Sequence, residues 1–147
     1  MHTVYLSLGT NLGDKEKNLV SAIKEIERRI GPVRAQSAFL TTEAWGFESE
    51  NTFLNAAVRV ETELSPNALL RITQQIEREM GRTRKSSVDP QQSTVIYHDR
   101  IIDIDILLYD DLHINTKKLT IPHPHMHERD FVLIPLKEIL LTKDTKQ

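Results

Sequence analysis

The 147-residue chain contains no cysteine, which excludes disulfide bonds and thiolate metal ligands and fits a reducing cytoplasm. No apolar run approaches the roughly 20 residues of a membrane helix, and the first residues, 1–4, are expected to begin a strand rather than a signal peptide. A net charge of −2 argues against a broad nucleic-acid surface. We therefore expect a cytoplasmic protein with no membrane and no nucleic acid among its partners.

Several catalytic and binding signatures are also absent. No Ser/His/Asp or Cys/His nucleophile set is apparent, and no aromatic K/R-G-F/Y motif of the kind that binds RNA is present. The glycines at 9 and 13 lack both the G-x-G-x-x-G spacing and the G-K-[ST] of a P-loop. What remains is an ordinary globular composition, 39% hydrophobic and 27% charged, which predicts a single domain over residues 1–147. A monomer is expected, although no sequence feature specifies the oligomeric state.

Hydrophobic spacing predicts the order of the elements. Strands are expected at residues 4–8, 33–40, 53–62 and 103–109, and amphipathic helices from Asp14 to Gly31 and from Ser65 to Gly81. The order β-α-β-β-α-β is the ferredoxin-like α+β arrangement, an antiparallel sheet with both helices on one face. The other face would be open to a ligand or to further elements. A hairpin at 112–120 and a short helix at 135–140 complete the expected fold.

Two aspartates, Asp103 and Asp105, lie inside an apolar run. Alternate side chains of a strand share a face, so Ile104, Ile106 and Leu108 should point one way and both carboxylates the other. The two α-carbons would lie roughly 7 Å apart, and desolvated like charges need a compensating cation. Carboxylates reaching a shared space suit Mg²⁺ with phosphates, although an edge strand with a wet polar face fits the same pattern.

Basic residues flank the long connection that precedes this strand, namely Arg78, Arg82, Arg84, Lys85 and Arg100. Arginine forks match phosphate oxygens, and metal-bridged carboxylates would supply the opposite pole of a triphosphate site. The connections at 41–52 and 81–99 both exceed the roughly 12 residues beyond which a loop is usually a lid, a binding loop or disordered. The pattern favours a lid over phosphates at 85–99, with a mobile insertion without function as the alternative.

Three further patterns are ambiguous when taken alone. Phe53 and Asn55 share a strand face and could bind a flat heterocycle, but a core-capping ring and a backbone-paired amide explain them more simply. Gln74 and Glu77 lie three residues apart, away from the apolar stripe of their helix, and are most simply a solvated face. The three histidines in 123–127 could bind zinc, but two prolines favour a rigid turn that presents one functional histidine, with Arg129 and Phe131 behind it.

Taken together, five motifs in this order resemble the 6-hydroxymethyl-7,8-dihydropterin pyrophosphokinase family across nearly the whole chain. They are G-T-N-L-G at 9–13, F-L-N-A-A-V at 53–58, Q-x-x-E-x-x-x-G-R-x-R at 74–84, R-I-I-D-I-D-I-L-L at 100–108, and I-P-H-P-x-M-x-x-R-x-F at 121–131. The chain departs from the family where Phe53 replaces a frequent tyrosine and where Thr42-Glu43-Ala44-Trp45 replaces the usual T-x-P segment.

The resemblance implies ATP-dependent transfer of diphosphate to a reduced pterin in folate biosynthesis, with two Mg²⁺ ions held by Asp103 and Asp105. It implies catalytic roles for Arg82, Arg84, Arg100, Asp103 and Asp105, and ATP contacts from Gln74, Glu77, Arg84, Ile106, His123 and Arg129. It implies a pterin site of Thr42, Trp45, Phe53, Asn55, Asp103 and Phe131. No side chain stands out as a general base. The alternative is a non-catalytic ferredoxin-like module that binds a metabolite or RNA.

Overall fold

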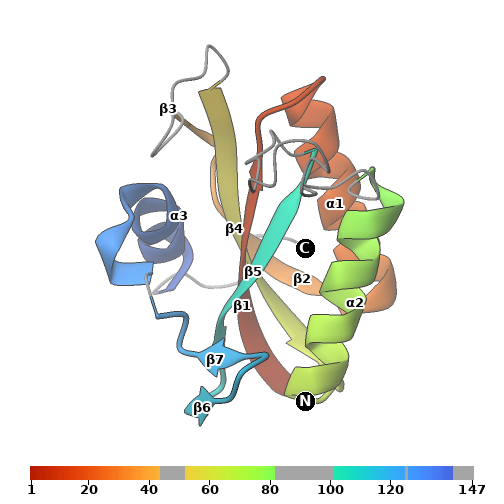
Figure 1. Ribbon diagram of the computed structural model, residues 1–147, viewed down its shortest axis with the longest axis vertical. Coiled ribbons are helices and arrows are strands. Elements are labelled where there is room, and N and C mark those ends of the chain that lie inside the picture. Colours follow the sequence, from red (N-terminus) through yellow and green to blue (C-terminus); the bar gives the residue numbers. More distant parts are fainter. Residues whose placement is uncertain (44–51, 82–100, 125, 141–147) are drawn as a thin grey trace, which may run out of the picture.

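The computed structural model describes residues 1–43, 52–81, 101–124 and 126–140 (Figure 1). Strands and helices follow one another along the chain in the order β1 (His2–Thr10), α1 (Lys15–Arg29), β2 (Val33–Gln36), β3 (Leu40–Glu43), β4 (Thr52–Thr62), α2 (Pro66–Glu79), β5 (Asp103–Tyr109), β6 (Ile114–Asn115), β7 (Thr120–Ile121), the 3₁₀ helix η2 (Met126–Glu128) and α3 (Asp130–Leu140). Within these ranges no helix is long and apolar enough to cross a bilayer.

The main sheet is antiparallel and has the strand order β2-β4-β1-β5, with β3 pairing to β4 as well. Helices α1 and α2 cover one face, while α3 lies on the other (Figure 1). The predicted α+β class, the antiparallel sheet and the placement of the first two helices on one face are confirmed. The assignment to the ferredoxin-like topology and to a single domain stays a prediction.

Both long helices begin and end where the sequence predicts. The carboxylate of Asp14 accepts from the N–H of Lys17 at 3.1 Å, and the hydroxyl of Ser65 accepts from the N–H of Ala68 at 3.2 Å, so each side chain caps a helix N-terminus. After α1 the chain passes close to β4 at Gly31, where a Cβ would lie 1.8 Å from the carbonyl oxygen of Glu61. Only glycine permits this approach.

The single strand predicted at 33–40 is wrong, because the structure divides it into β2 and β3. The break falls at Ser37, whose N–H donates to the carbonyl of Ala57 and whose hydroxyl accepts from the N–H of Ala57, both at 2.9 Å. A serine side chain that replaces a main-chain partner interrupts regular pairing. The chain then rejoins β4 as β3, which extends beyond the predicted end to Glu43.

The predicted helix at 135–140 is too short, since α3 begins at Asp130 and contains Pro135. Val132, Pro135, Leu136 and Ile139 are all buried, at helical spacing, so packing against the sheet outweighs the donor that proline lacks. The predicted hairpin is confirmed as two very short strands, β6 and β7.

The core has a layer on each face of the sheet. The larger layer packs Leu6 and Leu8 of β1 with Leu19 and Ile26 of α1 and Ile76 of α2. On the opposite face, two smaller clusters seat α3 against β2, β4 and β5, with these buried members: Ala35, Ala57, Leu107, Met126, Val132, Leu136 and Ile139. The second face is therefore partly covered by the chain itself.

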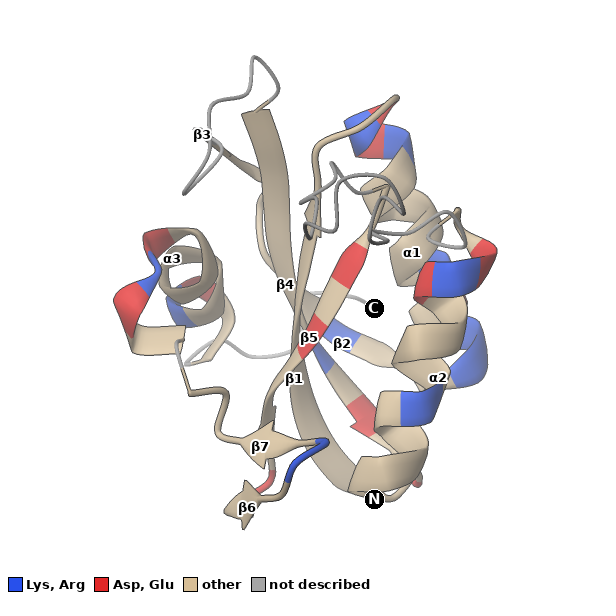
Figure 2. Cartoon of the chain, in the orientation of Figure 1, with Lys and Arg blue, Asp and Glu red and all other residues tan. Residues whose placement is uncertain are grey.

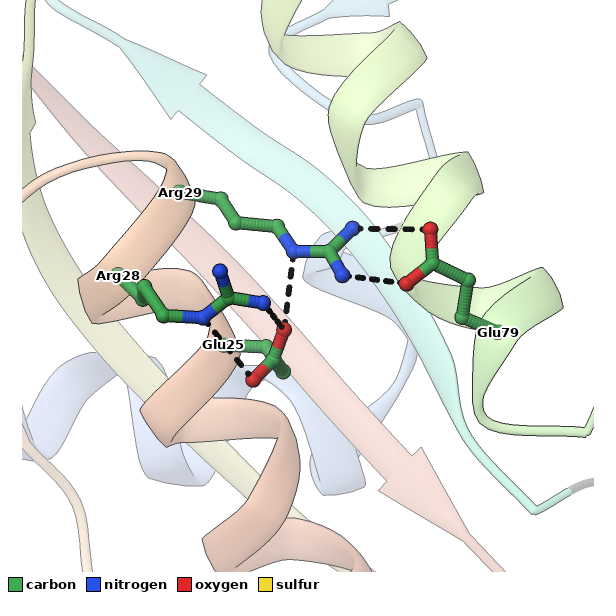
Figure 3. A network of polar contacts seen from close by, with 4 residues as sticks. All are labelled: Glu25, Arg28, Arg29 and Glu79. Atoms are coloured by element: carbon green, nitrogen blue, oxygen red, sulfur yellow. Dashed lines mark hydrogen bonds and ion pairs between the residues drawn. The ribbon is translucent and has the colours of Figure 1, made fainter.

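Polar contacts fasten the helices to their neighbours. The guanidinium of Arg29 on α1 pairs with Glu79 on α2 through both of its terminal nitrogens, and its Nε lies 2.9 Å from Glu25 (Figure 3). The hydrogen bond from Arg29 is the main cause that lowers the pKa of Glu79. On the other face, Arg59 donates to the carbonyl of Ile139 at 3.1 Å and Glu138 accepts from the N–H of Ala38 at 2.8 Å.

Asp110 ties the start of β1 to the end of β5. Its carboxylate accepts from the N–H of Thr3 at 2.7 Å and lies 2.7 Å from Nδ1 of His2. The pKa of Asp110 is lower than its ordinary value of 3.8, chiefly because of the Thr3 hydrogen bond; burial opposes this shift and His2 adds to it. Asp110 also adopts a φ of 47°, in the left-handed region that aspartate tolerates.

The lowered pKa predicts an acid-sensitive contribution to stability. Because the folded state favours the ionised carboxylate, the contribution is present above the unfolded pKa and is lost as the pH falls through the folded value. Asp110→Asn should therefore unfold at lower urea concentration than the wild type near pH 7, and the difference should shrink as the pH falls below the unfolded pKa of about 3.9. The exposed neighbour gives a control, Asp111→Asn, which should show no such gap. A gap that stays constant with pH would contradict the assignment.

Candidate functional site

The two strand carboxylates lie on the face that α3 partly covers. Ile104 and Ile106 belong to the core layer beneath α1 and α2, so by alternation Asp103 and Asp105 point to the opposite side. Figure 2 shows the two acidic bands along β5. In the strand order of the sheet, β5 lies at one end, beside β1. The predicted common face of the two aspartates therefore holds in the folded chain.

The predicted position of Leu108 on the face of Ile104 and Ile106 is wrong. Tyr5 pairs with Leu108 and Leu6 pairs with Ile106, so Leu107 is an extra residue in β5. This bulge reverses the alternation, and both Leu107 and Leu108 join the cluster beneath α3. The carbonyl of Leu107 then accepts from the N–H of His123 at 3.0 Å, which fixes the turn that carries this histidine.

A row of residues crosses the sheet through Gly9. In the strand register Gly9 pairs with Asn55 of β4 on one side and with Asp103 of β5 on the other. A Cβ at Gly9 would lie 3.1 Å from Oδ1 of Asn55, so the missing side chain leaves open the space between the amide and the carboxylate. Sequence reasoning did not identify Gly9 as a site residue, although pairing the first strand with the D-x-D strand would have indicated it.

The orientation of the Asn55 amide follows from its partners. Its nitrogen donates to the carbonyl of Leu40 at 3.3 Å and to Oγ1 of Thr42 at 2.9 Å. A carbonyl oxygen can only accept, so the nitrogen must face β3 and the amide oxygen faces Gly9. The backbone pairing expected for Asn55 is confirmed. The ring of Phe53 is half-buried and belongs to none of the core clusters among the described residues, so it is not the expected core cap.

Lys15, at the start of α1, holds the beginning of β4. Its Nζ donates to the carbonyl oxygen of Thr52 at 3.0 Å and to the hydroxyl of Thr52 at 3.1 Å. Thr52 immediately precedes Phe53, so the ammonium group fixes the main chain next to the ring. Nearby, Asn18 donates to the carbonyl of Leu12 at 2.7 Å, which secures the segment between β1 and α1.

A pocket of about 230 Å³ opens beside the edge of β5. Its lining comes from α2, β5, the β6–β7 turn and the segment that follows β7, with these residues: Leu70, Ile104, Asp105, Ile106, Lys117, Lys118, Leu119, Thr120, His123 and Pro124. The pocket therefore brings together three residues that the sequence proposed separately, namely Asp105, Ile106 and His123. It combines apolar walls with two ammonium groups and a carboxylate.

Lys117 and Lys118 were not among the site residues proposed from the sequence. They occupy a tight turn, in which the N–H of Thr116 donates to the carbonyl of Leu119 at 2.9 Å and the hydroxyl of Thr116 accepts from the N–H of Leu119 at 3.1 Å. Both lysines are exposed and line the pocket. A basic pair between two short strands is a weak signal without the tertiary contact to β5.

The remaining residues proposed from the sequence differ in their burial and in their contacts. Gln74 is exposed and does not line the pocket. Glu77 is only 4% exposed and accepts from the N–H of Ile104 at 2.7 Å, so its interpretation as part of a solvated face is wrong. Phe131 packs on the cluster beneath α3, and the guanidinium carbon of Arg129 lies 5.8 Å from its ring centre, within the range of a cation–π contact.

Some predictions fall outside the described residues. They concern Trp45, Arg82, Arg84, Arg100 and the loop at 85–99. His125 lies outside them as well, so the alternative of a three-histidine zinc site is not tested. In the part of the chain that the structure describes, no three or more His, Cys, Asp or Glu side chains form a group that could hold a metal ion. A metal at Asp103 and Asp105 would therefore need ligands beyond these side chains.

Lys15 provides a direct test of how β4 is held. Lys15→Met keeps the aliphatic stem and removes the donor, which should cost roughly 0.5–1.5 kcal/mol of unfolding free energy. Hydrogen exchange should accelerate in peptides that contain Thr52 and Phe53, because their main chain loses its anchor. Lys17→Met removes the same charge from an exposed position on the same turn and is the control. Equal exchange in the two variants would contradict the anchoring role.

Comparisons with known proteins agree with one another. Residues 5–141 match the model of the 7,8-dihydro-6-hydroxymethylpterin-pyrophosphokinase (HPPK) family. A 2-amino-4-hydroxy-6-hydroxymethyldihydropteridine pyrophosphokinase of Porphyromonas gingivalis is 48% identical over 140 residues, which cover 95% of this chain and 91% of that protein. The protein of the same name from Bacillus subtilis is 42% identical over 136 residues, covering 92% of this chain and 76% of the relative.

Solved structures show the same fold. An HPPK-DHPS in complex with substrates superimposes with a TM-score of 0.68 at 17% identity, and wild-type Plasmodium falciparum HPPK-DHPS with SDX-DHP does so with a TM-score of 0.67 at 16% identity. The matches cover 94% and 95% of this chain, which spans 40% of each of those longer chains. With the family match and the two bacterial relatives, they establish that this chain belongs to the HPPK family, the pyrophosphokinases of folate biosynthesis.

Proposed function

We propose that this chain transfers a diphosphate group from ATP to the hydroxymethyl group of 6-hydroxymethyl-7,8-dihydropterin and releases AMP, in a Mg²⁺-dependent reaction. The observation that carries the proposal is the position of the two carboxylates between two distinct places on the sheet. Asp103 adjoins the row of Gly9 and Asn55, while Asp105 lines the pocket beside β5. Two substrates bound at these places would meet at the D-x-D segment.

The nucleotide would occupy the pocket. Leu70, Ile106 and Leu119 give it apolar walls against which a base can pack, and His123 adds a polar side chain to the lining. Lys117 and Lys118 add positive charge for ribose or phosphate oxygens. Gln74 and Arg129 are proposed as ATP contacts because of their positions in the family motifs. Glu77 is left out of the proposed ATP site, because its carboxylate accepts from the N–H of Ile104.

The reduced pterin would lie over Gly9. The Asn55 oxygen can accept a hydrogen bond there, and the Thr42 hydroxyl, which accepts from Asn55, keeps its own proton to donate. An acceptor beside a donor can bind the edge of a heterocycle on which a hydrogen-bond donor lies next to an acceptor. Phe53 and Phe131 would provide the stacking faces, and Trp45 enters by motif position.

The donor set fits magnesium. Mg²⁺ prefers oxygen ligands, keeps several waters, and typically takes one or two carboxylates together with phosphate oxygens. Asp103 and Asp105 offer the two carboxylates on one face of β5. When bound, the ions would neutralise charge on the triphosphate. The number of ions, two, is proposed from the motif alone.

In the proposed reaction the hydroxymethyl oxygen attacks the β-phosphorus in line, and the bond between that phosphorus and the α–β bridging oxygen breaks. The hydroxyl proton leaves to solvent or a phosphate oxygen, since no side chain is assigned as the base. Phosphoryl-type transfer depends mainly on positioning and charge neutralisation. Arg82, Arg84 and Arg100 are proposed, by motif position, to bind the phosphates. Cytoplasmic location and a monomeric state stay predictions.

A coupled assay for AMP formation tests the reaction directly. With ATP and the reduced pterin, the wild type should form AMP, and Asp103→Asn or Asp105→Asn should lower turnover by at least about 10³-fold, because each loses a charged metal ligand. Asp111→Asn, an exposed aspartate just beyond β5, is the charge-matched control. Near-normal turnover of either site variant at ordinary Mg²⁺ concentration would remove the metal role, and no AMP from the wild type would remove the activity.

Calorimetry separates the two substrate places. Asn55→Ala or Phe131→Ala should weaken pterin binding by roughly 1–3 kcal/mol, since a buried polar edge or one stacking face is lost. Both variants should bind a non-hydrolysable ATP analogue normally. Lys118→Ala should show the opposite pattern. If Asn55→Ala or Phe131→Ala weakened the nucleotide while pterin binding stayed intact, the two places would be wrongly assigned.

A further inference from the structure

Glu77 is a buried carboxylate whose partner lies on the proposed metal-binding strand. It sits on α2, is 4% exposed, and accepts from the N–H of Ile104 at 2.7 Å. Ile104 is the residue between Asp103 and Asp105. The side chain therefore contacts the main chain of β5 midway between the two carboxylates.

The main chain of β5 is held from two sides at this point. Asp103 pairs with Gly9 and Asp105 pairs with Ser7, both on β1. Hydrogen-bonding groups alternate in direction along an antiparallel strand, so the N–H of Ile104 points away from β1, and there it meets Glu77. Helix α2 runs beside β5 on that side (Figure 1).

We propose that Glu77 is a positioning residue, which fixes β5 so that the carboxylates of Asp103 and Asp105 keep the spacing that the metal requires. This inference rests on the metal role in the proposed function. Groups that orient metal ligands from behind commonly change metal affinity about 10–100-fold when removed. Here the orientation acts through the backbone, one residue from each ligand.

One observation and one electrostatic argument favour this role over direct contact with the nucleotide. Glu77 does not line the pocket, whereas Ile104, to which it is hydrogen-bonded, does. A carboxylate facing a triphosphate would also be repelled, while a carboxylate that accepts from a main-chain N–H is stabilised by it.

The strand itself explains why such support is needed. Regular pairing with β1 is interrupted just after Ile106 by the Leu107 bulge and resumes at Leu108, and β5 has β1 as its one neighbour in the described sheet. An edge strand paired on one side can tilt or slip more easily than a central strand. Without Glu77, the N–H of Ile104 would be buried without this acceptor, and the strand would relieve that cost by rotating the peptide and moving both aspartates.

Two substitutions test the role against the Mg²⁺ requirement, which is measured in two ways. Without turnover, it is the Mg²⁺ concentration that half-saturates binding of a non-hydrolysable ATP analogue in calorimetry; with turnover, it is the Mg²⁺ concentration that gives half-maximal AMP formation. Glu77→Leu removes the acceptor and should raise both concentrations about tenfold or more. Glu77→Gln keeps a side-chain oxygen at the same reach and should recover most of the loss, to within about threefold of the wild type. The Michaelis constant for the pterin should change less than the metal requirement in both variants.

Glu79→Gln is the matched control, because it removes an exposed carboxylate from the same helix whose partner is Arg29 rather than β5. Its metal requirement should equal that of the wild type. Circular dichroism and thermal unfolding establish that each variant is folded. If Glu77→Leu does not fold, the near-isosteric Glu77→Gln decides alone: an activation constant raised tenfold or more would overturn the proposal, and a normal constant would support it.

The outcomes also separate this inference from the proposed function. If Asp103→Asn keeps normal turnover, the metal role falls and the positioning role falls with it. If Asp103→Asn is inactive but Glu77→Leu has the metal requirement of the wild type, only the positioning role is overturned. If Glu77→Gln is as impaired as Glu77→Leu, the negative charge itself is required, which would make Glu77 a direct participant and would also overturn the proposal.

Discussion

Pairing of β1 with β4 on one side and β5 on the other is the constraint on which the remaining features depend. It aligns Gly9 with both Asn55 and Asp103, although these residues are far apart in the sequence. Side-chain direction alternates along each strand, so a slip of one residue in either pairing would turn the amide or the carboxylate into the core. The hydrophobic layer that contains Leu6 and Leu8 opposes such a slip, because a one-residue shift of β1 would expose both side chains. Core packing and the chemistry of the site are thus enforced by the same register.

The two faces of the sheet have different roles, one in stability and the other in the proposed site. One face is filled by α1 and α2, whose contact is reinforced by Arg29 and Glu79, and it provides stability. The other face is only partly covered by α3, and on it Asn55 and Asp103 flank Gly9 in the strand register. Stability and function are nevertheless connected, since Glu77 reaches from the first layer to the strand that carries the aspartates.

Local chemistry made part of this predictable from the sequence. Asp14 and Ser65 cap their helices through short-range hydrogen bonds, and Asp103 and Asp105 stand out because charge interrupts an apolar strand. The features that were missed need partners distant in the chain. Glu77 looks solvated until the N–H of Ile104, 27 residues later, is placed beside it. The bulge at Leu107 gives no signal, because Ile106, Leu107 and Leu108 are apolar whichever face they occupy.

The bulge also divides β5 into two parts in which side chains alternate between the faces of the sheet with opposite parity. Before Leu107, odd-numbered residues face α3, and after it the relation is reversed, so that Tyr109 returns to the helix-side core. Substitutions in the second half can then follow the demands of packing without changing the direction of Asp103 and Asp105. The carbonyl of Leu107, which holds His123, lies at the junction. Deleting Leu107 would leave the other apolar residues of β5 unchanged, but it would remove the carbonyl that accepts from the N–H of His123.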